Sequence, residues 1–287
     1  MLLENPRGPP SGTTPSWPLL PALFASLERF GGGVRGARRR AYFVDSVFAD
    51  AEDRLRDLRV EVRVVPEVEP RFRFANKLAM FDGEAREETD LLVALDSDIV
   101  VAGDFSGYLE PAVVQAKQPD GDLLTLELWR RIFECFDLGL PPERYPTHLR
   151  PHWTHAYFST GVVLAPAAVL RPLHDRWLDF IRAPIDVAPT WPDLVEHMQT
   201  RVPYQEGATA DDLEPLYYAE QWAFSLALRD LRTPYSGLGP TGYAQPDRAI
   251  RRVNAAIGDA VALRHPPERP SETGPPSRSE VPSRSRS

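Results

Sequence analysis

The sequence predicts an α/β fold, a single domain whose mostly parallel central sheet is flanked by helices. Two observations carry this prediction. Strand-like segments at 41–47, 60–65 and 90–101 alternate with helix-like segments, which is typical of βαβ units. Within the third segment, residues 91–95 are apolar without interruption, as expected for a strand that helices cover on both faces.

Length and composition agree with one globular domain. The 287 residues can enclose a substantial core, and 33 basic against 41 acidic residues give a net charge of −8. Because no large basic stripe accompanies this charge, nucleic acid is a poor candidate partner. The single cysteine, Cys135, cannot form an intramolecular disulfide. No segment approaches the roughly 18 to 20 apolar residues of a membrane helix, and the N-terminus lacks a secretory signal pattern, so we expect a cytoplasmic protein without a transmembrane segment.

Changes in composition divide the chain into three parts. Residues 1–18 are rich in Pro, Gly, Ser and Thr and are predicted to form an irregular arm. Residues 19–265 carry the apolar patterns of the domain. Residues 266–287 contain Pro, Ser, Arg and Glu without apolar periodicity, so a disordered tail is expected. No strand is predicted ahead of the first helix.

The remaining elements follow from apolar periodicity. Helices are predicted at 19–30, 51–58, 74–81, 123–138, 167–181, 191–198 and 217–231, and further strands at 112–116, 156–165 and 260–264. The glycine- and arginine-rich stretch 31–40 follows a helix and precedes a strand. A phosphate-binding loop has the opposite order, so this stretch is predicted to be a connection.

Asp96 and Asp98 are the main candidate site. If the strand continues past Leu95, the two carboxylates point the same way from its carboxyl end, which is where ligands bind in open α/β sheets. Two close anions need a cation, a shared proton or solvent. The hypothesis is a divalent-metal site. The alternative is one turn or cap residue beside one solvated carboxylate.

His265 ends the predicted strand 260–264 and has two interpretations. It is either a surface residue or a further metal ligand, since imidazole together with carboxylate suits Mn²⁺. Lys77 and its neighbour Asn76 also have two interpretations: a phosphate contact, or a solvated part of a helix.

Two further groups interrupt apolar segments. Ser159, Thr160 and Gly161 break a strand-like run, where a glycine either permits close approach of a backbone or ligand or marks a bulge. Glu220 and Gln221 begin an apolar helix, where they either reach over a substrate or cap and solvate the helix.

Taken in order, short motifs of this chain resemble the GT-A class of nucleotide-sugar glycosyltransferases, especially its glycogenin/galactosyltransferase-like branch. The motifs are ANKL (75–78), LVALDSDIVV (92–101), YFSTGVVL (157–164), AEQWAF (219–224) and LRH (263–265). The resemblance implies a GT-A-like, Rossmann-like domain. It also implies metal-dependent transfer of a sugar from a nucleoside-diphosphate sugar to a hydroxyl acceptor, with Mn²⁺ or Mg²⁺ as cofactor.

The same resemblance implies roles for individual residues. Metal binding would fall to Asp96, Asp98 and His265; substrate binding to Asn76, Asp96, Ser159, Thr160, Gly161 and Gln221; and catalysis to Lys77 and Glu220. The chain departs from the family pattern at Ser159, where Asn is usual, and at Glu220, where Asp is usual. Pro-Pro follows His265, and the family's usual first strand is not recognised.

Two alternative functions remain open at this stage. A phosphohydrolase of the haloacid-dehalogenase type would use Asp96 as nucleophile. A degenerate GT-A domain would bind a nucleotide sugar without catalysis, and the missing first strand favours that interpretation. If sugar transfer inverts the anomeric centre, Glu220, Asp211 or Asp212 is the candidate base.

Overall fold

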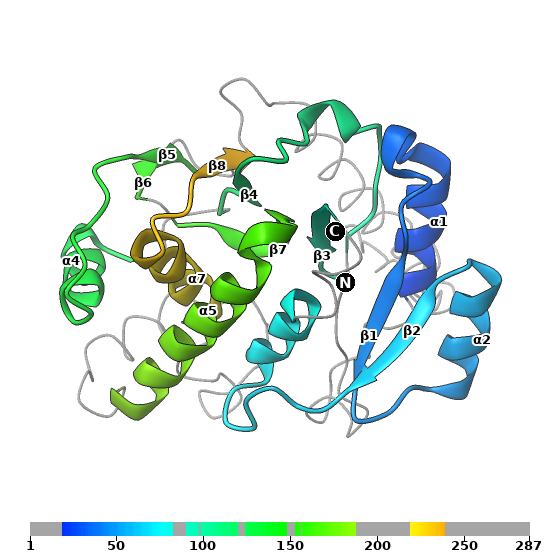
Figure 1. Cartoon of the computed structure of the whole chain (residues 1–287), viewed down its shortest axis with the longest axis horizontal. Coiled ribbons are helices and arrows are strands. Elements are labelled where there is room, and N and C mark those ends of the chain that lie inside the picture. Colours follow the sequence, from blue (N-terminus) through cyan, green and yellow to red (C-terminus); the bar gives the residue numbers. More distant parts are fainter. Residues whose placement is uncertain are drawn as a thin grey trace, which may run out of the picture.

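The computed structural model describes residues 19–82, 90–97, 99–119, 124–147, 153–155, 157–187 and 219–238. These residues confirm the α/β class (Figure 1). In chain order the elements are α1 (Leu20–Phe30), η2 (Gly32–Val34), β1 (Arg40–Val44), α2 (Ala49–Asp57), β2 (Glu61–Val65), η3 (Arg73–Phe81), β3 (Leu91–Leu95), η4 (Ser106–Tyr108), β4 (Val114–Lys117), α4 (Leu126–Glu134), β5 (Tyr145–Pro146), β6 (Trp153–Thr154), β7 (Ser159–Pro166), α5 (Ala167–Val187), α7 (Ala219–Asp230) and β8 (Tyr235–Leu238).

The main sheet is mixed. Its strand order is β3-β7-β4-β8, with β7 antiparallel to both neighbours and β4 parallel to β8. Therefore β3, β4 and β8 run in one direction, as predicted, and β7 alone is reversed. Because β7 is reversed, its first residues lie at the same edge as the carboxyl ends of the other strands. β1 and β2 form a separate parallel pair, and β5 pairs with β6.

Several boundaries differ from the predictions. The strand expected at 90–101 ends at Leu95, and the helix expected at 74–81 is the 3₁₀ segment η3. β5, β6 and β8 were not predicted, since each is too short for periodicity to reveal. The glycine-rich stretch 31–40 is a connection between α1 and β1, as predicted. The helix expected at 191–198 and the strand expected at 260–264 fall outside the described residues.

Trp177 of α5 joins three elements in the core. Its side chain is fully buried, and its ring lies 5.4 Å from the ring of Phe81 in η3 and 4.8 Å from that of Phe224 in α7. Its indole Nε1 donates a hydrogen bond of 2.7 Å to the backbone oxygen of Glu220. The long helix thereby fixes both η3 and the start of α7 behind the sheet.

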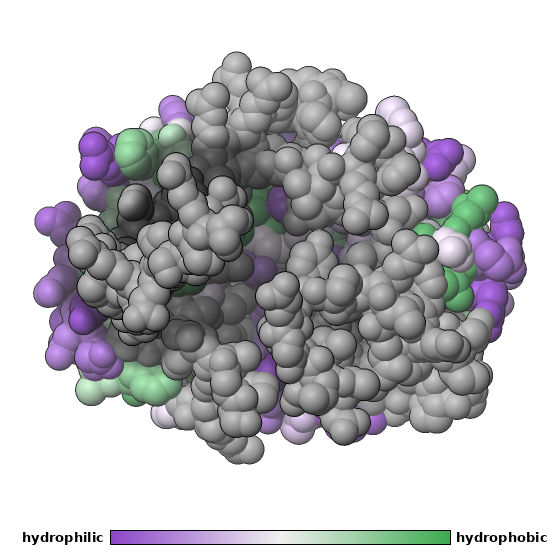
Figure 2. Space-filling model, turned by 180° about the vertical axis from the view of Figure 1, so that it is seen from behind, coloured by the Kyte–Doolittle hydropathy of each residue, from purple (hydrophilic) through white to green (hydrophobic). Residues whose placement is uncertain are grey.

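None of the helices among the described residues combines the length and apolarity that a membrane span requires. On the face shown in Figure 2, the coloured part of the surface is hydrophilic over much of the rim, with only small hydrophobic patches.

Glu69 links the segment that precedes η3 to α5. This buried carboxylate accepts hydrogen bonds from Arg71 at 2.8 Å and from Arg182 of α5 at 3.0 Å. The bond from Arg71, assisted by Arg182, outweighs burial and lowers the pKa of Glu69 from 4.5 to about 2. Because the folded pKa is depressed, this carboxylate stabilises the fold above about pH 4.5, and the contribution disappears as the pH falls through 2.

We therefore expect Glu69→Gln to lower the free energy of unfolding at pH 7 by roughly 1 to 3 kcal/mol, because charge-assisted hydrogen bonds are lost. The difference from wild type should shrink between pH 4.5 and pH 2. Urea unfolding monitored across this pH range measures it. Glu127→Gln is the control, since the Glu127–Arg130 pair is exposed and should contribute little. A pH-independent difference at Glu69 would contradict this account.

Candidate active site

The backbone turns immediately after β3. The N–H of Asp96 still donates to the carbonyl of Gly161 on β7 at 2.9 Å, but the N–H of Ile99 donates back to the carbonyl of Asp96 at 3.2 Å. The chain thus turns after Asp96, and Ser97 is buried. The prediction that Asp96 continues an extended strand is wrong, because the turn ends the alternation of side chains. Asp98 lies outside the described residues.

Lys77 of η3 lies at the centre of a buried polar cluster. Its Nζ is 3.2 Å from Oδ1 of Asp96, 3.0 Å from Oγ1 of Thr160 and 3.5 Å from Oε1 of Glu220. Lys77, Thr160 and Glu220 are 7%, 2% and 3% exposed. Four of the residues singled out in the sequence therefore meet at one point, although 143 positions separate Lys77 from Glu220.

Both carboxylate oxygens of Glu220 accept hydrogen bonds from neighbouring protein groups. Its Oε1 accepts a hydrogen bond of 2.9 Å from the Thr160 hydroxyl in addition to the Lys77 contact. Its Oε2 accepts a 2.9 Å bond from the backbone N–H of Gln221. A carboxylate held in this way at the first turn of α7 is oriented rigidly, and the positive end of the helix dipole favours its charge.

The charges of this cluster are strongly coupled. Burial by itself would lower the pKa of Lys77, but the negative charges of Asp96 and Glu220 outweigh it, so the pKa is raised and the ammonium persists. Burial raises the pKa of Glu220, and the Lys77 charge and the Thr160 hydrogen bond offset only part of that effect. With all three groups ionised, two carboxylates face one ammonium, which leaves a net negative charge that favours an added cation.

Gly161 lets the Asp96 carboxylate lie against the backbone of β7. A Cβ placed on Gly161 would come within 3.0 Å of Oδ2 of Asp96. The pairing of β7 with β4 also shifts here, since Ala116 pairs with Val163 but Lys117 pairs with Ser159. The register shift agrees with a bulge at Ser159–Gly161, and the group that approaches Gly161 closely is the Asp96 carboxylate. Close approach of a ligand stays a prediction.

The other predicted substrate-binding residues lie nearby but already have protein partners. Asn76 is buried, and its Oδ1 accepts the N–H of Val68 at 2.9 Å. Gln221 accepts a 2.7 Å hydrogen bond through Oε1 from the hydroxyl of Tyr157. Tyr157 was part of a recognised motif without an assigned role, and its ring packs 5.1 Å from Trp129.

One oxygen of Asp96 is suited to a cation. Oδ1 is buried against the Lys77 ammonium, whereas the side chain as a whole stays 28% exposed, which leaves Oδ2 as the oxygen for a ligand. Carboxylate oxygen is the ligand type that hard divalent cations prefer. Within the described ranges no group of three or more His, Cys, Asp or Glu converges on one point. His265, like Asp98, falls outside these ranges.

In this α/β fold the carboxylate–lysine cluster lies at the carboxyl end of β3, the edge at which open α/β sheets usually bind ligands. Residues 44–201, more than half of the chain, match the family model described as a Rhodobacterales glycosyltransferase domain. The chain therefore belongs to this family, and sugar transfer is the activity that its membership supports.

No curated protein sequence matches the chain. Among solved structures, the apo form of mouse xyloside xylosyltransferase 1 is similar to 86% of this chain and 91% of its own, with 15% sequence identity and a TM-score of 0.42.

Removing the Lys77 ammonium should leave the buried Glu220 carboxylate and the partly exposed Asp96 carboxylate uncompensated. We expect Lys77→Met to lower the free energy of unfolding by roughly 3 to 5 kcal/mol, the usual effect of removing one partner of a buried ion pair. Adding Glu220→Gln should restore part of this loss, because a neutral amide no longer requires the ammonium. Denaturant unfolding of the two single variants and the double variant measures the coupling. Additive effects would contradict a direct interaction.

A side chain at position 161 should push against the Asp96 carboxylate. We expect Gly161→Ala to lower stability by roughly 1 to 3 kcal/mol, as overpacking does. Gly107→Ala is the matched control, because a Cβ there would meet nothing within 4 Å. Thermal unfolding followed by circular dichroism compares the two variants. Equal melting temperatures would show that the 3.0 Å approach to Asp96 is of no consequence.

Proposed function

We propose that this chain transfers a sugar from a nucleoside-diphosphate sugar to a hydroxyl acceptor, with Mn²⁺ or Mg²⁺ bound at the carboxyl end of β3. The observation that supports this most directly is the position of Asp96. Its Oδ1 is fixed by Lys77 while Oδ2 remains for a ligand, at an edge where three strands end and β7 begins. The GT-A class and its glycogenin/galactosyltransferase-like branch are part of this proposal and rest on the ordered motifs.

In this proposal Asp96, Asp98 and His265 hold the cation. When bound, the cation neutralises negative charge on the departing diphosphate. Asp96 is the only one of the three among the described residues, and its carboxylate chemistry suits such an ion. Ser159, Thr160 and Gly161 form the neighbouring wall of the donor site, since they begin β7 beside Asp96.

Lys77 and Glu220 then act as positioning residues. The Lys77 ammonium orients Asp96 and offsets its charge, and it already contacts three oxygen atoms of the protein. Glu220 orients Lys77 through a direct contact and through Thr160. Since Glu220 is 3% exposed and fully engaged, it is poorly placed to reach an acceptor hydroxyl. A base at Asp211 or Asp212 remains a prediction, because both fall outside the described residues.

The phosphohydrolase alternative has less support. Asp96 would have to attack phosphorus, yet one carboxylate oxygen is paired with Lys77, and the matched family is one of glycosyltransferases. The non-catalytic alternative shares the same site and differs only in turnover, so activity separates it from the proposal.

Calorimetric titration of a panel of nucleotide sugars, with and without Mn²⁺, tests the proposal. We expect Mn²⁺-dependent binding by the wild type and at least a tenfold loss in Asp96→Asn and in Asp98→Ala, because a metal ligand is lost. Asp90→Asn is the matched control, since Asp90 has an exposed side chain at the opposite end of β3.

Three results would revise the proposal. Failure of the wild type to bind any nucleotide sugar in Mn²⁺ would overturn it. Release of phosphate from small phosphomonoesters would favour the hydrolase. Binding without transfer to any acceptor, and without slow hydrolysis of the donor, would favour the non-catalytic domain.

A further inference from the structure

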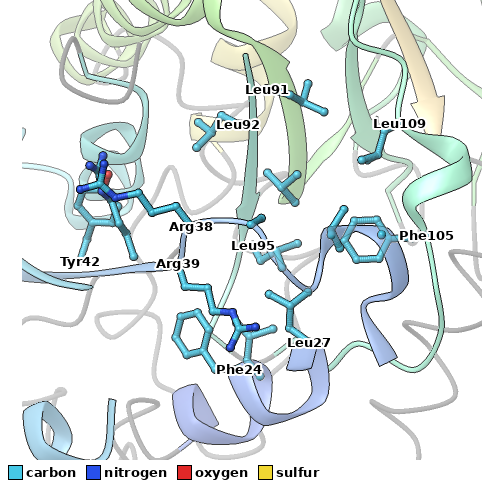
Figure 3. A pocket seen from close by; sticks show the side chains of 16 residues that line it. Phe24, Leu27, Arg38, Arg39, Tyr42, Leu91, Leu92, Leu95, Phe105 and Leu109 are labelled. Carbon is cyan, nitrogen blue, oxygen red and sulfur yellow. The ribbon is translucent and has the colours of Figure 1, made fainter. Parts of the chain in front are cut away.

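A cavity of about 420 Å³ is bordered by both β1 and β3 (Figure 3). Tyr42 of β1 and Leu92 and Leu95 of β3 line it, and Phe24 and Leu27 of α1 lie below them in the view of Figure 3. The β1–β2 pair and the four-stranded sheet therefore face the same mainly apolar space.

The backbone of β3 directs hydrogen-bonding groups toward this space. Successive residues of an antiparallel strand alternate between pairing with the partner strand and pointing away from it. The N–H of Asp96 donates to β7, and the C=O of Asp90 accepts from the residue that follows β7, so the even-numbered residues of β3 pair with β7. The N–H and C=O groups of Val93 and Leu95 therefore point the other way, although Leu95 is only 7% exposed.

The backbone of β1 does the same. β1 is parallel to β2, and both the N–H of Asp45 and the C=O of Arg39 bond to β2, so the odd-numbered residues of β1 pair with that strand. The N–H and C=O of Tyr42, which is buried and lines the cavity, therefore point away from β2. Buried backbone groups are nearly always paired. Both edges thus require a partner that none of the described strands supplies.

One predicted strand has no counterpart among the described residues. The other five predicted strands correspond to observed ones, namely β1, β2, β3, β4 and β7, whereas 260–264 falls outside the described ranges. Its sequence, AVALR, has five residues, the same length as β1 and β3. Pro266 and Pro267 follow it closely, and proline cannot donate to a ladder, so the strand should end there.

We infer that residues 260–264 form the strand that joins the two parts of the sheet, between β1 and β3 and parallel to β3. The chain length permits this placement. The 21 residues 239–259 separate β8 from this segment, and a crossover between parallel strands needs about a dozen. When extended, these residues reach about 70 Å, against about 19 Å for the four strand spacings from β8 to the cavity.

The N-terminal residues 1–18 are the other long segment next to α1, and they suit the position less well. They contain five prolines, and each proline lacks the N–H that a central strand must donate. Only Met1, Leu2 and Leu3 form an apolar run there.

The parallel direction has a consequence for the proposed metal site. It carries His265, which directly follows the segment, to the carboxyl end of β3, where Asp96 lies. This direction rests on the proposed function, in which both residues hold the cation. The pairing of 260–264 with β1 and β3 does not rest on it.

Disulfide formation in the full chain, in a Cys135→Ser background, tests the pairing. We expect Val93→Cys with Ala262→Cys to form an intramolecular disulfide in most molecules under mild oxidation, since neighbouring strands bring Cα atoms within the roughly 4.4 to 6.8 Å that a disulfide requires. Val64→Cys with Ala262→Cys is the matched control, because Val64 is an exposed residue of β2, on the far side of β1, and should not cross-link.

A second set of cysteine pairs tests the direction. In the parallel arrangement Leu91→Cys should cross-link to Ala260→Cys, at the starts of the two strands. In an antiparallel arrangement it would cross-link to Arg264→Cys instead.

Amide hydrogen exchange of the full chain tests the pairing without cysteines. We expect the amides of Val93 and Leu95 to exchange at least a hundredfold more slowly than in an unfolded chain. Ala262→Pro should reduce this protection at least tenfold, because proline removes a ladder hydrogen bond from the middle of the strand. Ser277→Pro, beyond the predicted strand, is the control and should leave the protection unchanged.

Three results would overturn the inference: no cross-link between positions 93 and 262, a disulfide between two chains instead of within one, or protection that Ala262→Pro leaves unchanged. If the cysteine pair prevents folding, the exchange measurement decides. A cross-link from position 91 to 264 would overturn the parallel direction. Because none of these measurements uses metal or nucleotide sugar, a chain that forms the strand but binds no nucleotide sugar would contradict the proposed function alone.

Discussion

The contact of the Lys77 ammonium with Asp96 and Glu220 is the interaction on which the site depends. Placing an ammonium group at 7% exposure is costly unless opposite charges surround it, and here two carboxylates and a hydroxyl do so. Neither the Lys77 ammonium nor the Glu220 carboxylate could remain buried and charged alone. The cluster therefore forms only when η3, the end of β3, the start of β7 and the start of α7 are all in place.

The fold brings these four elements together by packing rather than by chain continuity. Trp177 contacts Phe81 and Phe224, so α5 holds η3 and α7 against each other. The reversed direction of β7 places Thr160 and Gly161 at the same edge as Asp96. A parallel strand at that position would present its carboxyl end there instead. The orientation of one strand thus decides which side chains border the acidic group.

The region that matches the family model contains only part of the buried cluster. The matched region, 44–201, includes Lys77, Asp96 and Thr160 but not Glu220, which comes from a later helix. The buried cluster therefore joins the region that defines the family to residues beyond it.

The sequence by itself determined the α/β class, the course of α1 and the apolar core of β3, because periodicity and uninterrupted apolar runs are local properties. It also singled out Lys77, Asp96, Thr160 and Glu220 as chemically notable. Only the tertiary structure showed that Lys77 is buried beside two carboxylates rather than solvated. That outcome rests on contacts across 83 and 143 positions, which no local pattern encodes. The structure also showed that the chain turns after Leu95, where the N–H of Ile99 donates to the carbonyl of Asp96, although the apolar residues that follow in the sequence had suggested a continued strand.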